Sequence, residues 1–293
     1  MNNTAYKGIT STLTLERFFR CCVFSFSLVA SAAFAVDTDR DGLTDEYEGG
    51  WDTYDPITVP QEFNDLVDTV LAEGSKIDES FLNPAYQNDL TLSEPAEIRV
   101  TFIKEGASNR NSLGYYTYSE ETFKNKTKGD IDTDNSSVIS VGELAALPDV
   151  EIGWVFPNAS KRDAWGGELV NGDSYIIGDN RTFPTGTKIG FFLVSKGWVG
   201  DGTILQPYRG GIKPYVMFTT DFLNPEAGLD TVISTNSYDN NSRQFALLFD
   251  GGNRNEVIMG IEDIRRRRYP DGRIGGDQDF NDAVFSVSST PST

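Results

Sequence analysis

The chain has 293 residues and a formal net charge of −19, from 25 basic and 44 acidic residues. This excess of negative charge argues against nucleic acid and anionic membrane surfaces as partners, and it suits divalent cations. The sequence contains no histidine, which excludes Ser-His-Asp and Cys-His catalysis and most zinc sites.

Residues 1–35 are typical of a secretory signal peptide. Basic residues precede an apolar stretch at 21–34, and the stretch ends in the small-x-small pattern Ala33-Phe34-Ala35. The apolar run is too short for an ordinary membrane span. We expect cleavage after Ala35 and a secreted or cell-surface protein. Since both cysteines lie in this leader, we expect a mature chain without disulfides and without a membrane span.

Residues 36–50 contain an acidic loop that fits the twelve-residue calcium template of EF-hands, with Gly42 at position 6. Position 8 is Thr44 rather than an aliphatic residue, so the loop resembles the calcium loops of thrombospondin type 3 repeats. The alternative is a disordered acidic segment. The expected ligands, at positions 1, 3, 5, 9 and 12, are Asp37, Asp39, Asp41, Asp45 and Glu48.

Residues 51–95 are expected to form a helical connector with one amphipathic helix at 60–73. Pro60 suits a helix start, and Gly74 ends the pattern. The residues that follow are polar and resemble a linker. The apolar stripe at helical spacing consists of Phe63, Leu66, Val67, Val70 and Leu71.

From residue 96 to residue 293 the pattern is mainly β. Short apolar runs alternate with clusters of Gly, Asn, Asp and Pro, and no long helix intervenes, which favours an antiparallel, jelly-roll-like β-sandwich. The expected strands are Glu97–Lys104, Gly114–Tyr118, Glu151–Phe156, Ser174–Ile177, Lys188–Ser195, Pro214–Thr220, Arg243–Phe249, Glu256–Ile264 and Ala283–Val287.

An insertion at residues 130–147 interrupts the strands and fits the calcium template a second time, with aliphatic Ile139 at position 8. Ser137 replaces the glycine at position 6, and the exiting helix could begin at Leu144. The alternative is a polar loop without an ion. The expected ligands are Asp132, Asp134, Ser136, Ser140 and Glu143.

A third group of oxygen ligands lies near the C-terminal end. In an extended strand, Asp277, Asp279 and Asn281 would share a face with Ala283, and Asp263 would continue the face of Ile261. Carboxylates gathered at a sheet rim are costly without a cation, and oxygen-only ligands favour Ca²⁺. The alternative is a solvated acidic turn. The candidate ligands are Glu262, Asp263, Asp277, Asp279, Asn281 and Asp282.

Four consecutive arginines, residues 265–268, lie between these acidic residues. We expect them to form a solvated loop that neutralises the neighbouring carboxylates rather than a nucleic-acid site.

The order of these motifs resembles a bacterial secreted domain, the domain of unknown function family 4114. The resemblance covers roughly residues 110–287, and its most specific part is the run Gly276-Asp277-Gln278-Asp279-Phe280-Asn281-Asp282-Ala283-Val284-Phe285. Members occur in exported proteins and large adhesins, often beside calcium repeats. The resemblance implies a β-sandwich and a calcium site formed by Asp263, Asp277, Asp279 and Asp282. It implies no reaction.

Together these features predict an exported, calcium-binding β-sandwich that acts as a surface interaction or adhesion module, with a glycan or protein as a further partner. The alternatives are a calcium-dependent module that recognises a glycan or peptide, and a carboxylate-based glycosidase. No catalytic residue is assigned, and we do not expect an enzyme.

Overall fold

The computed structural model describes residues 54–82, 90–162, 164, 167–198, 215–227, 243–249 and 256–292. The expected signal peptide and the calcium loop at 36–50 lie outside these residues. Among the described helices, none is both long and apolar enough to cross a membrane.

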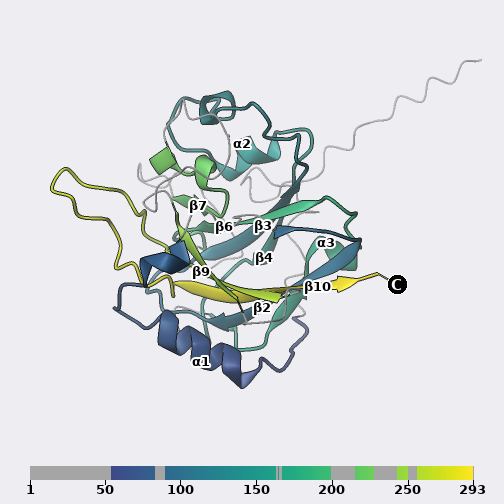
Figure 1. The fold of residues 1–293 in the computed structure, drawn as a ribbon, viewed down its shortest axis with the longest axis vertical. Helices are drawn as coiled ribbons and strands as arrows, with labels where there is room; N and C mark the ends of the chain where they lie inside the picture. Colours follow the sequence, from purple (N-terminus) through teal and green to yellow (C-terminus); the bar gives the residue numbers. More distant parts are fainter. Residues whose placement is uncertain are drawn as a thin grey trace, which may run out of the picture. The chain divides into compact units, whose positions relative to one another are not determined.

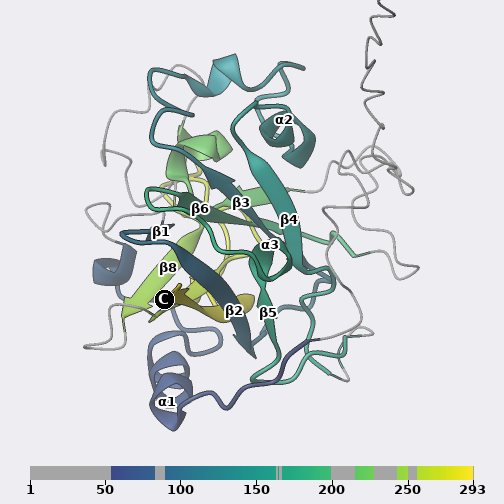
Figure 2. The ribbon, with the colours of Figure 1, turned by 90° about the vertical axis from the view of Figure 1, so that its right-hand side faces the viewer.

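The described strands form two antiparallel sheets (Figures 1 and 2), which confirms the predicted mainly β, sandwich architecture. Sheet A has the order β1 (Leu90–Thr91), β6 (Lys188–Val194), β3 (Ser112–Tyr118) and β4 (Glu151–Phe156), and β7 (Val216–Phe218) also pairs with β6. Sheet B has the order β5 (Ser174–Ile176), β2 (Ala96–Lys104), β10 (Ala283–Pro291), β9 (Glu256–Ile261) and β8 (Phe245–Phe249).

Each of the nine expected strands is present, with ends that differ by a few residues. β9 stops at Ile261 rather than Ile264, and β10 continues to Pro291 rather than stopping at Val287. The two-residue strand β1 was not predicted, because two residues are too short to show an alternating pattern.

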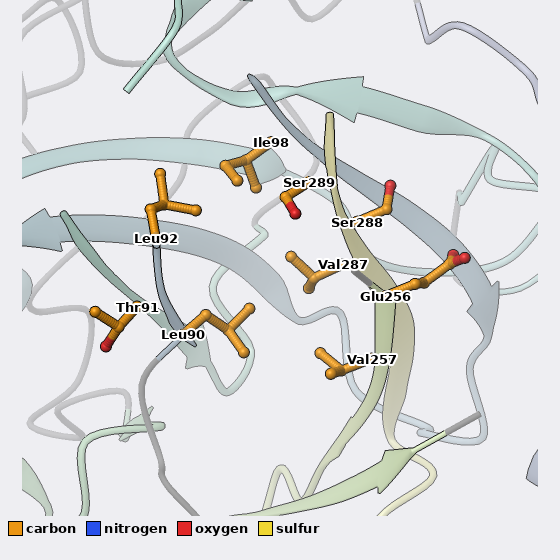
Figure 3. Close-up of a pocket in the computed structure, with 9 residues that line it drawn as sticks. All are labelled: Leu90, Thr91, Leu92, Ile98, Glu256, Val257, Val287, Ser288 and Ser289. Carbon is orange, nitrogen blue, oxygen red and sulfur yellow. The ribbon is translucent and has the colours of Figure 1, made fainter. Parts of the chain in front are cut away.

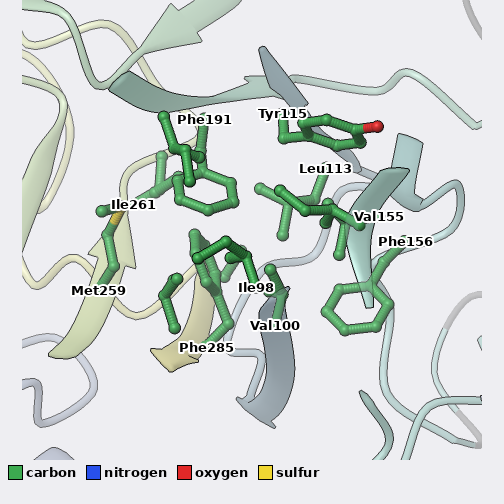
Figure 4. Close-up of a cluster of buried hydrophobic side chains, with 14 of the residues drawn as sticks. Ile98, Val100, Leu113, Tyr115, Val155, Phe156, Phe191, Met259, Ile261 and Phe285 are labelled. Carbon is green, nitrogen blue, oxygen red and sulfur yellow. The ribbon is translucent and has the colours of Figure 1, made fainter. Parts of the chain in front are cut away.

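The central core lies between the two sheets (Figure 4). Phe191 of sheet A meets Phe285 of sheet B edge to face, with ring centroids 5.2 Å apart. Most strands are buried on both faces, so their sequences read as continuous apolar runs. In β6, for example, Phe191 faces the central core while Phe192 faces a second cluster on the other side of sheet A.

The outer face of sheet A is covered by residues from 123–144 and 216–223. This segment includes the short 3₁₀ helices η3 (Lys128–Asp130) and η4 (Asp221–Leu223), the latter followed by η5 (Pro225–Ala227). Helix α2 (Val141–Ala145) begins at Val141, before the expected Leu144, because Ser140 and Glu143 form a capping box. Ile139 and Leu144 are fully buried, and they fix the loop at 132–143 against the sheet.

The outer face of sheet B is covered by helix α1 (Gln61–Val70), as Figure 1 shows. Phe63, Val67 and Leu71 are buried in this cluster together with Ile258 and Val284. Each such side chain stabilises the fold by roughly 1.5–3 kcal/mol through burial. The remaining short helices are η2 (Glu79–Leu82) and α3 (Ile177–Asn180).

Candidate metal centre

The ends of β9 and β10 bring the C-terminal acidic residues to one rim of sheet B. The two strands are antiparallel, with Ile261 paired to Ala283. Glu262 and Asp263, which follow β9, therefore lie next to Asp282, which precedes β10. This juxtaposition at one rim was predicted from the sequence, and the register confirms it.

The conformation of residues 276–282 differs from the expected strand. Gly276, Gln278 and Phe280 have positive φ values of 78°, 67° and 54°, so Asp277 and Asn281 do not continue a pleated face. Phe280 instead turns into the cluster under α1, where it is fully buried. The sequence interpretation failed here because burial of Phe280 and local hydrogen bonds of polar side chains override strand alternation.

Three carboxylates form what we call the rim centre: Glu262, Asp277 and Asp282. They offer oxygen atoms that all lie within 4.8 Å of one another. Glu262 is fully buried, and its Oε1 accepts a 3.0 Å hydrogen bond from the backbone N–H of Phe280. Its Oε2 is buried and has no hydrogen-bond partner among the described residues. A buried carboxylate oxygen without a donor is costly, and a cation can satisfy it.

The surroundings of the rim centre oppose ionisation. Burial raises the pKa of Glu262 to about 8, and the charges of Asp277 and Asp279 raise it further, against the hydrogen bond from Phe280. Burial also raises the pKa of Asp282 well above its usual range, and the charge of Asp263 adds to this effect. The two carboxyl groups therefore hold protons at neutral pH unless a positive charge lies among them.

Asp263 was predicted as a ligand, but it does not join the rim centre. Its Oδ2 accepts 2.9 Å hydrogen bonds from the side-chain amides of Asn109 and Asn111. Its backbone N–H donates to Asp282 Oδ2 at 2.7 Å. Asp263 thus fixes the position of Asp282, and its own charge is satisfied by two asparagines that sequence reasoning did not identify.

A second acidic group, the Glu73 group, consists of Glu73, Asp277 and Asp279, with oxygen atoms within 4.8 Å of one another. Asp277 belongs to both groups. Asp279 is buried, and its Oδ2 accepts a 2.7 Å hydrogen bond from the N–H of Gly74. Asn281, also a predicted ligand, is buried and directs its amide toward Leu71 O at 3.4 Å. No sequence signal pointed to Glu73, because it is an exposed glutamate just beyond a helix.

Glu105 is a further buried carboxylate in this region that the sequence gave no reason to select. Its Oε1 has no partner among the described residues. Burial raises the pKa of Glu105 to about 7, and the charges of Asp263 and Glu73 contribute to the rise. Lys161 donates its side-chain amine to the backbone oxygen of Glu105 at 3.1 Å.

The loop at 132–143 also gathers carboxylates, since Asp132, Asp134 and Glu143 lie within 4.8 Å of one another. Ser137, at position 6, adopts a φ of 67°, the conformation that glycine takes at this position. The structure therefore reproduces the turn that the template requires, although the sequence lacks the glycine.

The side chains of this loop are already hydrogen bonded to the loop itself. Asp132 accepts from the N–H groups of Ser136 and Ser137, and Glu143 accepts from Thr133 and Ser140. Burial alone would raise the pKa of Glu143, but these hydrogen bonds outweigh it and lower the pKa. The hydroxyl groups of the predicted ligands Ser136 and Ser140 donate within the loop, to Val138 O and to Glu143. This loop has a weaker need for a cation than the rim centre.

The arginine run at 265–268 is not the solvated loop that was expected. Arg265 pairs with Glu226 at 2.8 Å, and Arg266 is 1% exposed. Arg266 donates to the backbone oxygen of Arg243 at 2.7 Å and lies over the ring of Phe280. Only Arg267 and Arg268 are exposed. Packing against neighbouring segments, which the local charge pattern does not show, buries the first two arginines.

A small cleft lies where the ends of β1, β2, β9 and β10 meet (Figure 3). It holds about 110 Å³ and is lined mainly by apolar residues and hydroxyl groups, including Leu90, Val257 and Ser288. Glu256 is its one charged lining residue. Ligand pockets usually enclose roughly 300–1,000 Å³, so the cleft is too small to compete with the rim as a candidate site.

The segment that carries both β9 and β10 also carries every member of the rim centre. Residues 183–290 match the family model called domain of unknown function (DUF4114). The DUF4114 region thus contains Glu262, Asp277 and Asp282. It begins well after residue 110, where the sequence resemblance was expected to start, and it leaves out Glu73, Glu105 and the loop at 132–143. No curated protein and no solved structure matches the chain significantly.

Proposed function

We propose that this chain is an exported β-sandwich that binds Ca²⁺ at the rim centre and acts as a surface interaction module. The observation that carries the proposal is Glu262, a fully buried carboxylate whose Oε2 has no partner among the described residues. Asp277 and Asp282 place two further carboxylates beside it.

The chemistry of the ligand set favours a hard divalent ion. The rim centre offers only oxygen ligands, and three ionised carboxylates would repel one another strongly at these separations. A divalent cation offsets that repulsion and satisfies the buried oxygen. Calcium accepts irregular carboxylate sets more readily than magnesium, which requires near-octahedral geometry.

The ion would act on the fold because its ligands come from two separate segments. Glu262 follows β9, whereas Asp277 and Asp282 precede β10. An ion bound only by the folded state adds RT ln(1 + [L]/Kd), about 2.7 kcal/mol when calcium exceeds Kd a hundredfold. Such a contribution is a large part of the stability of an ordinary domain.

Export is consistent with this role. The leader that ends at Ala35 would send the chain to a compartment where calcium is plentiful, and the remaining sequence has no cysteine to form a disulfide. The loops at 37–48 and 132–143 are candidates for further ions. We assign the interaction role from the resemblance to exported surface proteins.

A glycosidase is less well supported by the geometry. A glycosidase needs two carboxyl groups that flank a sugar and contact it. In the rim centre Glu262 is fully buried, which suits an ion ligand better than an acid or nucleophile that meets a polysaccharide.

Calorimetric titration with calcium tests the proposal. We expect the wild-type protein to bind calcium and Glu262→Gln to bind it at least about tenfold more weakly, since glutamine keeps the shape and loses the charge. Asp132→Asn and Asp39→Asn report on the other two loops. Exposed Glu94→Gln is the matched control. Equal calcium affinity in the wild type and in Glu262→Gln would remove the rim centre from the proposal.

A further inference from the structure

Residues 264–276 form a projecting hairpin, which we call the arginine hairpin. Tyr269 N–H donates to Arg273 O at 2.8 Å, and Gly275 N–H donates to Arg267 O at 2.9 Å. Pro270-Asp271-Gly272 forms the tip, where Gly272 has a φ of 86° and its N–H donates to Tyr269 O. In Figure 1 the hairpin is the yellow loop that extends away from the sheets.

Two of its arginines anchor the base of the hairpin. Arg265 pairs with Glu226, and its guanidinium lies 5.2 Å from the ring centroid of Tyr215. Arg266 is buried and lies 4.9 Å from the ring centroid of Phe280. These contacts hold the entering strand against the body of the protein.

Three other arginines, Arg267, Arg268 and Arg273, are exposed. Arg267 and Arg273 lie 4.6 Å and 5.5 Å from the ring centroid of Tyr269. Arg273 also pairs with Asp271 at 2.7 Å, so the outer hairpin keeps a positive balance on a chain with a net charge of −19.

Two exposed large hydrophobic side chains adjoin the base of the hairpin. Ile264 is 52% exposed and Tyr215 is 44% exposed, and both belong to the three exposed large hydrophobics of the described residues. Arginine, tyrosine and exposed apolar groups on one projection are a composition typical of recognition surfaces.

We propose that the arginine hairpin binds a carboxylate-bearing polysaccharide and that calcium at the rim centre is required for this binding. The inference rests on the proposed function, because the ion would join both ends of the hairpin: Glu262 lies just before it and Asp277 just after it. Ordering of this base fixes the direction in which Arg267 and Arg273 project.

The chemistry of the surface favours a uronic acid chain over other anions. Guanidinium groups match carboxylates with paired hydrogen bonds, and the apolar faces of sugars suit Tyr215 and Ile264. Nucleic acid has a denser charge that the acidic body of the protein would repel. A protein partner would need about 800 Å² on each side, more than a hairpin tip provides.

The test measures binding of a short oligogalacturonate by calorimetry at fixed free calcium, and again in EDTA. We compare the wild type with Arg267→Glu/Arg273→Glu and with the charge-matched control Lys124→Glu/Arg162→Glu, which changes exposed residues elsewhere. We expect the hairpin variant to bind at least about tenfold more weakly, the control to bind like the wild type, and EDTA to weaken wild-type binding to the level of the hairpin variant. A calcium titration of each protein is run alongside.

The outcomes separate the two proposals. Calcium binding by all three proteins, with loss of oligogalacturonate only in the hairpin variant, supports both. Calcium binding with equal oligogalacturonate affinity in the wild type and the hairpin variant overturns the hairpin proposal alone. No calcium binding by the wild type overturns the ion site and the calcium requirement with it. Tighter binding of duplex DNA or of an acidic peptide overturns the ligand class.

Discussion

Asp279 and Gly74 lie 205 positions apart in the sequence, yet Asp279 Oδ2 accepts a 2.7 Å hydrogen bond from the N–H of Gly74. The same turn is held by Ile77, whose N–H donates to Gln278 O at 2.8 Å. The end of α1 is therefore joined to the loop that carries the rim centre, and the helix that covers sheet B also supports the acidic residues.

Replacement of Asp279 should separate its structural role from any ion. Asp279→Ala removes the acceptor for Gly74 N–H in a buried setting, which should lower the free energy of unfolding by about 1–3 kcal/mol even in EDTA. Urea denaturation measures this change. Glu73→Gln, the companion variant, should alter stability only when calcium is present. An Asp279→Ala protein as stable as the wild type in EDTA would contradict the role assigned to the contact.

The rim centre predicts an unusual dependence of stability on pH. In the absence of calcium, the folded protein holds protons on Glu262, whose pKa is about 8, and on Glu105, whose pKa is about 7, whereas the unfolded chain releases them near 4.5. The folded state therefore binds more protons over this window, and stability should fall as the pH rises from about 5 to 8.

Calcium should reverse this trend because it competes with protons for the same oxygen atoms. Melting temperatures measured from pH 5 to 8 in EDTA and in calcium test the point, and stabilisation by calcium should grow with pH. Glu262→Gln should flatten the profile in EDTA. A metal-free protein that becomes more stable toward pH 8 would exclude the proposed electrostatics.

Gly260 permits the close approach of β9 to the rim loop. A Cβ atom at this position would lie 2.2 Å from the backbone oxygen of Phe280 and 2.7 Å from Leu71 Cδ1. Gly260→Ala should therefore displace the loop, lower stability by about 1–3 kcal/mol and weaken calcium binding, since Phe280 N–H orients Glu262.

A matched control for this variant is Gly142→Ala, because nothing lies within 4 Å of a Cβ atom there. This change in helix α2 should be neutral or stabilising by roughly 0.5–1 kcal/mol. Denaturation curves and calcium titrations of both proteins decide the matter. Unchanged calcium affinity in Gly260→Ala would show that the loop does not position Glu262.

Ser137 provides a test of the loop at 132–143. A serine with a φ of 67° is strained relative to glycine, and Ser137→Gly should raise the free energy of unfolding by about 0.5–1 kcal/mol after the entropy cost of glycine. Ser137→Ala keeps the strained backbone, so it should bring no gain. Urea denaturation compares the three proteins, and equal stability of the glycine and alanine variants would refute the argument.

Local pattern was sufficient for the strands and for part of the site. Alternating and continuous apolar runs located all nine expected strands, and the oxygen-rich residues that flank β9 and β10 were identified before their pairing was known. The stripe at Phe63 and Val67 located α1 equally well. These features depend on neighbours a few positions away, so the sequence contains them directly.

The membership of the rim centre was decided only by the tertiary structure. Glu73 reaches the site from the end of α1, and Asn109 and Asn111 draw Asp263 away from it. Phe280 breaks the expected strand because it is buried under α1, and Arg266 is buried although the basic run resembles a solvated loop. Each outcome depends on packing between segments far apart in the chain, and packing of that kind leaves no periodic trace in the sequence.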